Sequence, residues 1–376
     1  MNTSKYLKIA FALLTVAVIV VACGSPESAV TDLPVFPSPT KTELTPTAYE
    51  ADPENEDLAV RLGLTEPQVA TLRSLAQLDD YPLYSMYYYS EYQGTSADDS
   101  LEKPAVSETW TPAPSWACSL FAALGDPDGG VYGRNFDWEH SPAVLLFTDP
   151  PSGYASVSMV DIAFLGFSGT GAAGLTERPL GTILDLLDAP YLPIDGVNEM
   201  GVAIGMAAVP AGDVPHDPDK ETLGSLGVIR AVLDKAADVD EAVAILTSHN
   251  IDFSGGPPIH YLVADRAGGA ALVEHYMGEV KVITNQSPWH HATNFLRSSE
   301  GDSAEGACWR YDKIQQQLTD MEGKLTPLAA MSLLEAVSQD NTQWSIVYGM
   351  NTGEVHVALD RKYQQVYVLH LDVIGE

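Results

Sequence analysis

The sequence is poor in cysteine and in basic residues. Only three cysteines, Cys23, Cys118 and Cys308, occur in 376 residues, so the chain can form one disulfide at most. Lys and Arg number 19 against 51 Asp and Glu, which gives a formal net charge of −32. No basic patch interrupts this acidic surface, and we therefore exclude nucleic acid as a partner.

A long hydrophobic run is also lacking. Lys5 and Lys8 precede the apolar stretch Ile9 to Ala22, which is too short for a comfortable membrane span and predicts a signal peptide over residues 1–22. A small residue followed by Cys23 looks like the bacterial lipobox, so we expect lipidation of Cys23 and an extracytoplasmic protein anchored to the cell membrane. An ordinary signal peptide is the alternative. Its removal would leave a net charge of −34.

Large apolar residues are scarce between the signal and the first helix. The stretch Gly24–Asn55 is rich in Pro, Ser and Thr and cannot bury enough surface to fold, so we expect a disordered tether over residues 23–60. Thr65 with Gln68 three residues later has the spacing of a capping box. A short helix is predicted to follow the tether.

The remaining sequence predicts mostly strands, interrupted by two pairs of helices. Grouped strands separated by paired helices indicate sheets whose outer faces are covered by helices. Strands are expected at 119–124, 131–135, 143–148, 156–165, 202–209, 259–264, 270–275, 279–284, 343–349, 354–359 and 365–371. Helices are expected at 225–237, 238–250, 309–321 and 327–337.

Cys118 stands close to two charged residues. Arg134 follows it by sixteen positions and Asp137 by nineteen, on or just after the next predicted strand. A nucleophilic cysteine needs a base and a positive neighbour. The base can be a distant histidine, or the cysteine's own α-amino group if the chain is cut before it. Side chains alternate along a strand, so alternation alone would place Arg134 and Asp137 on opposite faces.

Five ordered blocks carry a resemblance to a known family. They are Cys118 with "GRNFDW", then "IDGVNEMGVAIG", "WHHATNF", "CWRYDKI" and "TQWSIVYGMNTGEVHVAL". Together they resemble the N-terminal-nucleophile amidohydrolases of the choloylglycine hydrolase and penicillin V acylase group. The similarity is closest to the autoproteolytic acyltransferase and linear amide hydrolase branch that includes isopenicillin N acyltransferase. It implies an α+β fold, a four-layer αββα sandwich.

The resemblance also implies self-cleavage between Ala117 and Cys118. Residues 61–117 would then be a pro-segment or small subunit, and residues 118–376 the catalytic domain. The two chains would remain packed together as a heterodimer. The implied activity is cleavage of a linear amide, a small molecule, or transfer of its acyl group, with no cofactor.

Site residues follow from the resemblance one by one. Cys118 is the nucleophile, Arg134 favours its thiolate, and Asp137 orients the new α-ammonium group. Asn294 is expected to donate to the oxyanion, and Arg310 to complete the charge network. Ala208 stands where the bile-salt and penicillin enzymes have a second asparagine donor. This departure favours the acyltransferase-like branch and leaves the second oxyanion donor open.

Two rival functions remain open. One is a papain-like cysteine peptidase that uses Cys118, His290 or His291, and Asn294, although it would need the cysteine at the start of a helix. The other is a surface-binding lipoprotein of the same fold without catalysis.

Several other residues are expected to have structural roles or to compete with those above. Asn285 competes with Asn294 as the oxyanion donor, and Asn198 is expected to form a turn. Cys308 is expected to be a buried core residue, with a disulfide to Cys118 as the alternative. The adjacent pair His290–His291 lacks the spacing of a metal-binding face, and no metal site is predicted.

Overall fold

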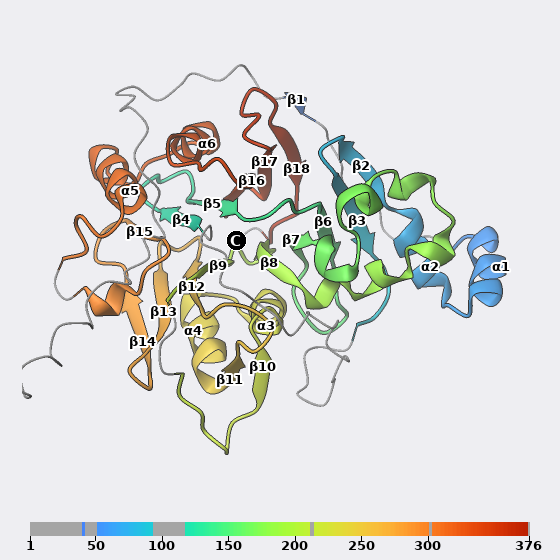
Figure 1. Cartoon of the computed structure of the whole chain (residues 1–376), viewed down its shortest axis with the longest axis horizontal. Helices are drawn as coiled ribbons and strands as arrows, with labels where there is room; N and C mark the ends of the chain where they lie inside the picture. The colour runs from blue at the N-terminus through green and yellow to red at the C-terminus, as the bar shows by residue number, and fades with distance from the viewer. Residues whose placement is uncertain (1–39, 42–50, 93–116, 211–213, 301–302, 375–376) are drawn as a thin grey trace, which may run out of the picture.

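The computed structural model describes residues 40–41, 51–92, 117–210, 214–300 and 303–374 (Figure 1). The predicted signal peptide and the predicted lipidation site Cys23 lie outside these ranges. No helix within them is both long enough and apolar enough to span a membrane.

Two large sheets form the centre of the described part of the chain. The first has seven strands in the order β1-β18-β17-β16-β5-β4-β15. Their bounds are Thr40–Lys41 (β1), Ala117–Ala123 (β4), Val131–Asp137 (β5), Trp289–Ala292 (β15), Thr342–Gly349 (β16), Glu354–Leu359 (β17) and Tyr367–His370 (β18).

The second sheet has nine strands in the order β14-β13-β12-β9-β8-β7-β6-β3-β2 within the same described ranges. Their bounds are Ala76–Asp79 (β2), Leu83–Tyr88 (β3), Ala143–Thr148 (β6), Ser156–Asp161 (β7), Pro193–Asn198 (β8), Ala203–Ala208 (β9), Ile259–Ala264 (β12), Ala270–Tyr276 (β13) and Glu279–Thr284 (β14). A small parallel pair, Thr222–Gly224 (β10) and Asn250–Asp252 (β11), lies beside it.

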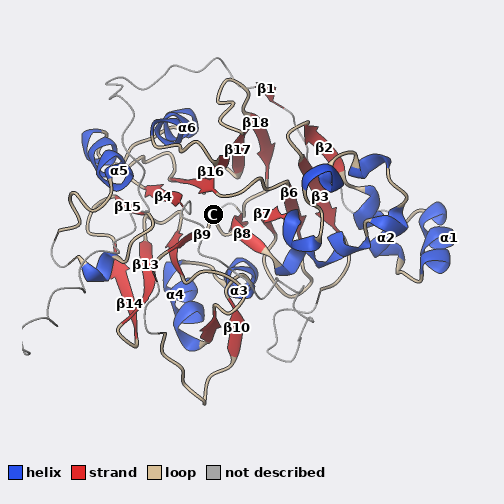
Figure 2. Ribbon diagram, in the orientation of Figure 1, coloured by secondary structure: helices blue, strands red, loops and turns tan. Residues whose placement is uncertain are grey.

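Helices cover the outer face of each sheet (Figures 1 and 2). Helices α5 (Trp309–Asp320) and α6 (Pro327–Ala336) pack on the seven-stranded sheet. Helices α3 (Gly227–Lys235) and α4 (Val239–Ser248) pack on the nine-stranded sheet. The inner faces of the two sheets share the largest apolar cluster. The predicted four-layer αββα sandwich is therefore confirmed.

Alternation along β4 shows how the sequence builds these layers. Leu120 and Ala122 join the core between the sheets. Phe121 and Ala123 point to the other side and join the core beneath α5 and α6. Both faces of this strand are buried, so its sequence is apolar throughout rather than alternating with polar residues.

The N-terminal segment differs from its prediction. Residues 53–62 form helix α1 (Pro53–Leu62), and strand β1 pairs with β18, although both positions fall at least partly in the predicted tether. Asp52 caps α1 by accepting the Glu54 amide at 2.9 Å. Asn55 is buried and accepts a 2.8 Å hydrogen bond from Arg73. Composition describes only the local segment, so it could not predict a helix that is held by a contact 18 positions away.

Residues 51–92 are an integral part of the sandwich. The predicted short helix is α2 (Glu66–Arg73), with both hydrogen bonds of its capping box present. Strand β3 pairs in parallel with β6 along its whole length, and β2 forms the edge beyond it. A pro-segment or small subunit that ended at Ala117 would therefore contribute two strands to the nine-stranded sheet.

The region after β7 also differs from expectation. The strand predicted over 156–165 ends at Asp161, whose carboxylate accepts the Ala163 amide at 2.9 Å and starts a 3₁₀ turn. Short 3₁₀ segments follow at Ile162–Leu165, Gly169–Ala172, Leu175–Glu177, Leu180–Thr182 and Leu184–Tyr191, and another lies at Arg297–Ser299. Strand β8 was not predicted, because Pro, Asp and Gly in "PIDGVN" are uncommon in strands.

Candidate active site

Cys118 lies near the start of β4, between β5 and β15. It is a free thiol, is almost wholly buried, and belongs to the apolar cluster between the two sheets. It pairs with Phe136 of β5. The side chain therefore faces the second sheet, and the disulfide considered with Cys308 does not form.

Arg134 reaches the thiol from the same face of the neighbouring strand. Its Nη2 lies 3.8 Å from Cys118 Sγ and donates to the Met206 carbonyl at 3.1 Å. Its Nη1 forms a buried ion pair with Asp195 Oδ2. Tyr348 donates to Asp195 Oδ1 at 2.5 Å. Asp195 and Tyr348 therefore fix the arginine beside the sulfur.

Sequence reasoning did not assign a role to Asp195 or Tyr348. Asp195 is separated from Arg134 by 61 positions and from Tyr348 by 153. The available signal was an aspartate within β8, a strand that is buried along its whole length. A buried charge needs a partner, and Arg134 is that partner here.

Asp137 lies on the opposite face of β5 from Arg134, as alternation predicts. Its Oδ1 accepts a 2.5 Å hydrogen bond from Thr342, while its Oδ2 is buried without a hydrogen-bond partner. The nearest cation is Arg310, whose Nη1 is 3.8 Å from Oδ2. Burial raises the pKa of Asp137 to about 6, although Arg310 and Thr342 oppose the increase.

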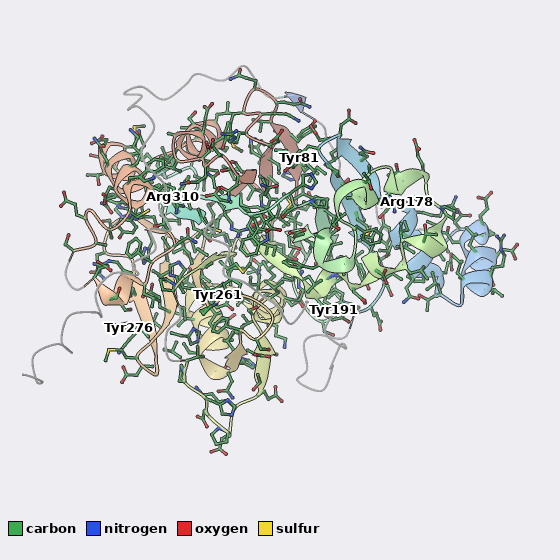
Figure 3. The ribbon with its side chains drawn as sticks, in the orientation of Figure 1. Tyr81, Arg178, Tyr191, Tyr261, Tyr276 and Arg310 are labelled. Carbon is green, nitrogen blue, oxygen red and sulfur yellow. The ribbon has the colours of Figure 1, made fainter. Side chains whose placement is uncertain are left out.

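Arg310, labelled in Figure 3, lies in the first turn of α5, and its guanidinium contacts β4. Its Nη1 donates to the Cys118 carbonyl and to Ser119 Oγ, the latter at 2.9 Å. Its Nη2 donates to Asn294 Oδ1 at 3.0 Å. One buried guanidinium thus joins the cysteine backbone, Asn294 and Asp137.

Asn294 follows β15 and contacts the cysteine directly. Its Oδ1 accepts the Cys118 amide at 2.5 Å, and its Nδ2 donates to the Ala208 carbonyl at 2.8 Å. An amide nitrogen carries two hydrogens, so one remains for a further acceptor. The competing Asn285 instead donates to the Ser287 carbonyl at 2.9 Å and accepts the Ala270 amide.

The surroundings of Cys118 oppose ionisation in the uncut chain. Burial raises the pKa of the thiol, and the charge of Asp137 acts in the same direction. Arg134, Arg310 and a hydrogen bond from the Asp137 backbone lower it, but they do not outweigh burial. The buried environment therefore favours the protonated thiol.

The arrangement does not match a papain-like site. Cys118 lies in a strand rather than at a helix start. His290 is paired with Ala122, four residues along β4 from the cysteine, or about 13 Å. His291 is paired with Phe121, which faces the helices, and its ring packs on Tyr311 with centroids 4.0 Å apart. Neither histidine hydrogen-bonds to Cys118.

The remaining candidates have local roles. Asn198 Oδ1 accepts the Met200 and Val202 amides at 3.1 and 2.9 Å, which forms the turn before β9. Cys308 is buried at the start of α5. Among the residues that the structure describes, no group of three or more His, Cys, Asp or Glu side chains could hold a metal ion.

Part of the chain matches a known family model. Residues 193–362 match the family described as acyl-coenzyme A:6-aminopenicillanic acid acyl-transferase. The match covers 170 of the 376 residues, which is less than half of the chain. The match confirms the predicted group, so the chain is an N-terminal-nucleophile enzyme of the amide hydrolase and acyltransferase class. The acyl-transferase region contains Asp195, Asn294 and Arg310, whereas Cys118, Arg134 and Asp137 precede it.

Solved structures show weaker likeness to the chain. Penicillin V acylase from Agrobacterium tumefaciens is 17% identical, with a TM-score of 0.48, over 68% of this chain and 87% of that one. A mutant of conjugated bile acid hydrolase from Clostridium perfringens is 14% identical, with a TM-score of 0.49, over 68% of this chain and 92% of that one. Likeness at this level supports no inference about substrates. A search of curated proteins found no match.

Proposed function

We propose that this chain is a lipid-anchored, extracytoplasmic amidase or acyltransferase that acts on linear amides through an N-terminal cysteine. Cleavage between Ala117 and Cys118 would free that cysteine. The observation that carries the proposal is the open oxygen of Asp137. A buried carboxylate oxygen without a hydrogen bond is costly, and a new α-ammonium group on Cys118 would supply the donor that Arg310, at 3.8 Å, does not.

The cleavage step follows from the groups around Cys118. The sulfur attacks the Ala117 carbonyl carbon, the C–N bond breaks, and the amine takes the thiol proton. Water then hydrolyses the thioester, which leaves a carboxylate on Ala117 and restores the thiol. Arg310 donates to the Cys118 carbonyl and Asn294 accepts the Cys118 amide, so both hold the backbone beside the scissile bond.

Turnover of a substrate would use the same residues. The thiol attacks the substrate carbonyl, and the α-amine carries the proton to the leaving nitrogen. Arg134 favours the thiolate through its 3.8 Å approach to sulfur. The spare hydrogen of Asn294 Nδ2 would donate to the oxyanion, a contact that can contribute about 3 kcal/mol to lowering the barrier. Water or an amine then resolves the thioester.

The N-terminal fragment is expected to stay bound as a small subunit. Besides the strand pairing of β3 with β6, Tyr88 donates to the Leu187 carbonyl at 3.0 Å and Tyr92 to Asp234 at 2.8 Å. Tyr81 also donates to Gln343 at 2.5 Å, next to the Thr342 that binds Asp137. We expect the two fragments to copurify without denaturant.

The direct test is to express the full chain in a bacterium that exports it and to sequence the N-termini of the purified protein. A fragment that begins Cys-Ser-Leu-Phe is expected, and Cys118→Ala should give one uncut chain without amidase activity. Wild-type protein that stays whole while active would refute the mechanism. Radiolabelled fatty acid incorporation, lost in Cys23→Ser, would test the anchor separately.

The substrate class is tested with a panel of acylated amino acids, acylated amines and lactams. The family description names an acyl-coenzyme A donor and 6-aminopenicillanic acid as acceptor. We therefore include an acyl thioester with and without an added amine. A product in which the acyl group is joined to the added amine indicates transfer, whereas free acid alone indicates hydrolysis.

A further inference from the structure

Glu274 is a buried carboxylate that the reaction itself does not use. It lies in β13, opposite His260 of β12, and is fully shielded from solvent. Leu262 and Leu272 share the faces of His260 and Glu274 in their strands, and both belong to the core between the sheets. The pair therefore faces the same inter-sheet space as Cys118.

Hydrogen bonds surround this carboxylate. Oε1 accepts the Arg297 amide at 2.7 Å and lies 3.0 Å from His260 Nδ1. Oε2 accepts both the amide and the hydroxyl of Ser298, at 2.8 and 2.7 Å. A carboxylate offers about four acceptor positions, so its capacity is filled. Burial acts to raise the pKa of Glu274, but the hydrogen bonds from His260 and Ser298 outweigh it and lower the pKa.

These bonds fix the segment that follows Asn294. A 3₁₀ turn begins with Arg297 and Ser298, three residues after Asn294. Leu296, between Asn294 and this turn, is buried. On the other side, β15 ends at Ala292. Asn294 therefore sits in a short connection held at both ends, by the sheet before it and by Glu274 after it.

We propose that Glu274 is a positioning residue that acts through Asn294, by holding the 297–298 turn to the second sheet. The inference rests on the proposed function, because Asn294 acts there on the cysteine backbone and on the oxyanion. Because the connection is short, a displacement of the 297–298 turn also displaces Asn294. A shift of about 1 Å at a reacting centre can reduce the rate about 10²-fold.

The first test is Glu274→Gln, assayed on the cleaved enzyme with active sites counted by thiol titration. The new NH₂ group would face N–H donors of the turn, so at least one hydrogen bond is lost. We expect kcat to fall about 10- to 100-fold with KM changed less than about threefold. An unchanged kcat would overturn the proposal.

A double-mutant cycle separates positioning from general damage. If Glu274 acts through Asn294, Glu274→Gln should reduce kcat, expressed per cleaved chain, by less than about twofold when added to Asn294→Ala. Effects that multiply would overturn the proposal. Should Glu274→Gln fail to fold, Ser298→Ala removes a single hydroxyl hydrogen bond and takes its place in the cycle.

Asp265→Asn is the matched control. Asp265 is also a buried carboxylate that accepts backbone amides, from Val239, Ala267 and Gly269, each at 2.9 Å. It follows β12 at Ala264, the opposite end of the strand from His260, and makes none of the hydrogen bonds of the 297–298 turn. We expect a loss of thermal stability with kcat within about twofold of wild type. An equal loss of kcat in both variants would assign Glu274 a structural role only.

The two proposals fail in different ways. If wild-type protein neither cuts itself nor turns over any amide, the proposed function fails and the positioning role of Glu274 fails with it. If wild type is active and the cycle is multiplicative, only the positioning role of Glu274 is lost.

Discussion

Asp195 and Asp137 make an instructive pair, because both are fully buried near a buried arginine and yet differ in their hydrogen bonds. Both oxygens of Asp195 are occupied, by Arg134 and Tyr348. Asp137 has one oxygen bound to Thr342, whereas the other has no hydrogen-bond partner and lies 3.8 Å from Arg310 Nη1. The difference teaches that the carboxylate of the ion pair beside the thiol has a hydrogen bond on each oxygen, whereas Asp137 keeps one oxygen open to the ammonium group that the proposed cleavage would create.

The largest effect is expected from Asp137→Asn. The neutral amide of asparagine cannot form an ion pair with the new α-ammonium group. The amine therefore loses its orientation, and the charged form of the amine is no longer favoured. We expect self-cleavage and kcat/KM to fall by about 10²- to 10⁴-fold, as for loss of a general acid–base group. Fragment ratios on denaturing gels and steady-state kinetics measure both. Activity near that of wild type would remove the distinction between the two aspartates.

A pH experiment on the uncut Cys118→Ala protein tests the open oxygen itself. Asp137 has a folded-state pKa of about 6 against an ordinary value of 3.8. A carboxyl group whose pKa is raised in the folded state stabilises the fold at pH values below its unfolded-state pKa. This stabilisation is lost as the pH rises through the folded-state pKa. We expect Asp137 to make the uncut protein less stable at pH 7 than at pH 4 by roughly 1–3 kcal/mol.

The control for this experiment is Asp137→Asn in the same Cys118→Ala background. Asp161 also has a pKa raised to about 6 by burial, and its contribution is present in both proteins. The difference between the free energies of unfolding of the two proteins, measured with urea from pH 4 to pH 7, therefore isolates the contribution of Asp137. Identical pH dependence would show that the open oxygen has no energetic consequence.

Asp195→Asn should have a smaller effect on catalysis. The substitution leaves Arg134 without its anionic partner, so the guanidinium is no longer fixed 3.8 Å from the sulfur. We expect kcat/KM to fall about 10- to 100-fold and the protein to lose about 3–5 kcal/mol of stability, the usual cost of breaking a buried ion pair. Iodoacetamide reactivity of Cys118 against pH reports the thiol directly. A reactivity profile like that of wild type would mean that Asp195 only stabilises the fold.

Tyr348→Phe should have the smallest effect. It removes one hydrogen bond to Asp195 and leaves the ion pair with Arg134 in place. We expect a fewfold loss in kcat/KM and about 1–3 kcal/mol of stability, because one buried acceptor is left unsatisfied. An effect as large as that of Asp195→Asn would show that the tyrosine, rather than the arginine, holds the carboxylate.

Much of the site could be predicted because it is local. Cys118, Arg134 and Asp137 lie on two strands that are adjacent in sequence, and the alternation of β5 correctly separated Arg134 from Asp137. The acceptor of Asn294 Nδ2 could not be predicted in the same way. Its bond to the Ala208 carbonyl spans 86 positions and depends on how the two sheets stack.

The sequence by itself determined the strands and helices with strong local signals, such as the capping box at Thr65 and the apolar alternation of β4, because those preferences act over a few residues. Only the tertiary structure decided that residues 51–92 complete the nine-stranded sheet and that Asp195 holds Arg134. Pairing of buried charges and of distant strands depends on which groups folding brings together, and sequence spacing does not record it.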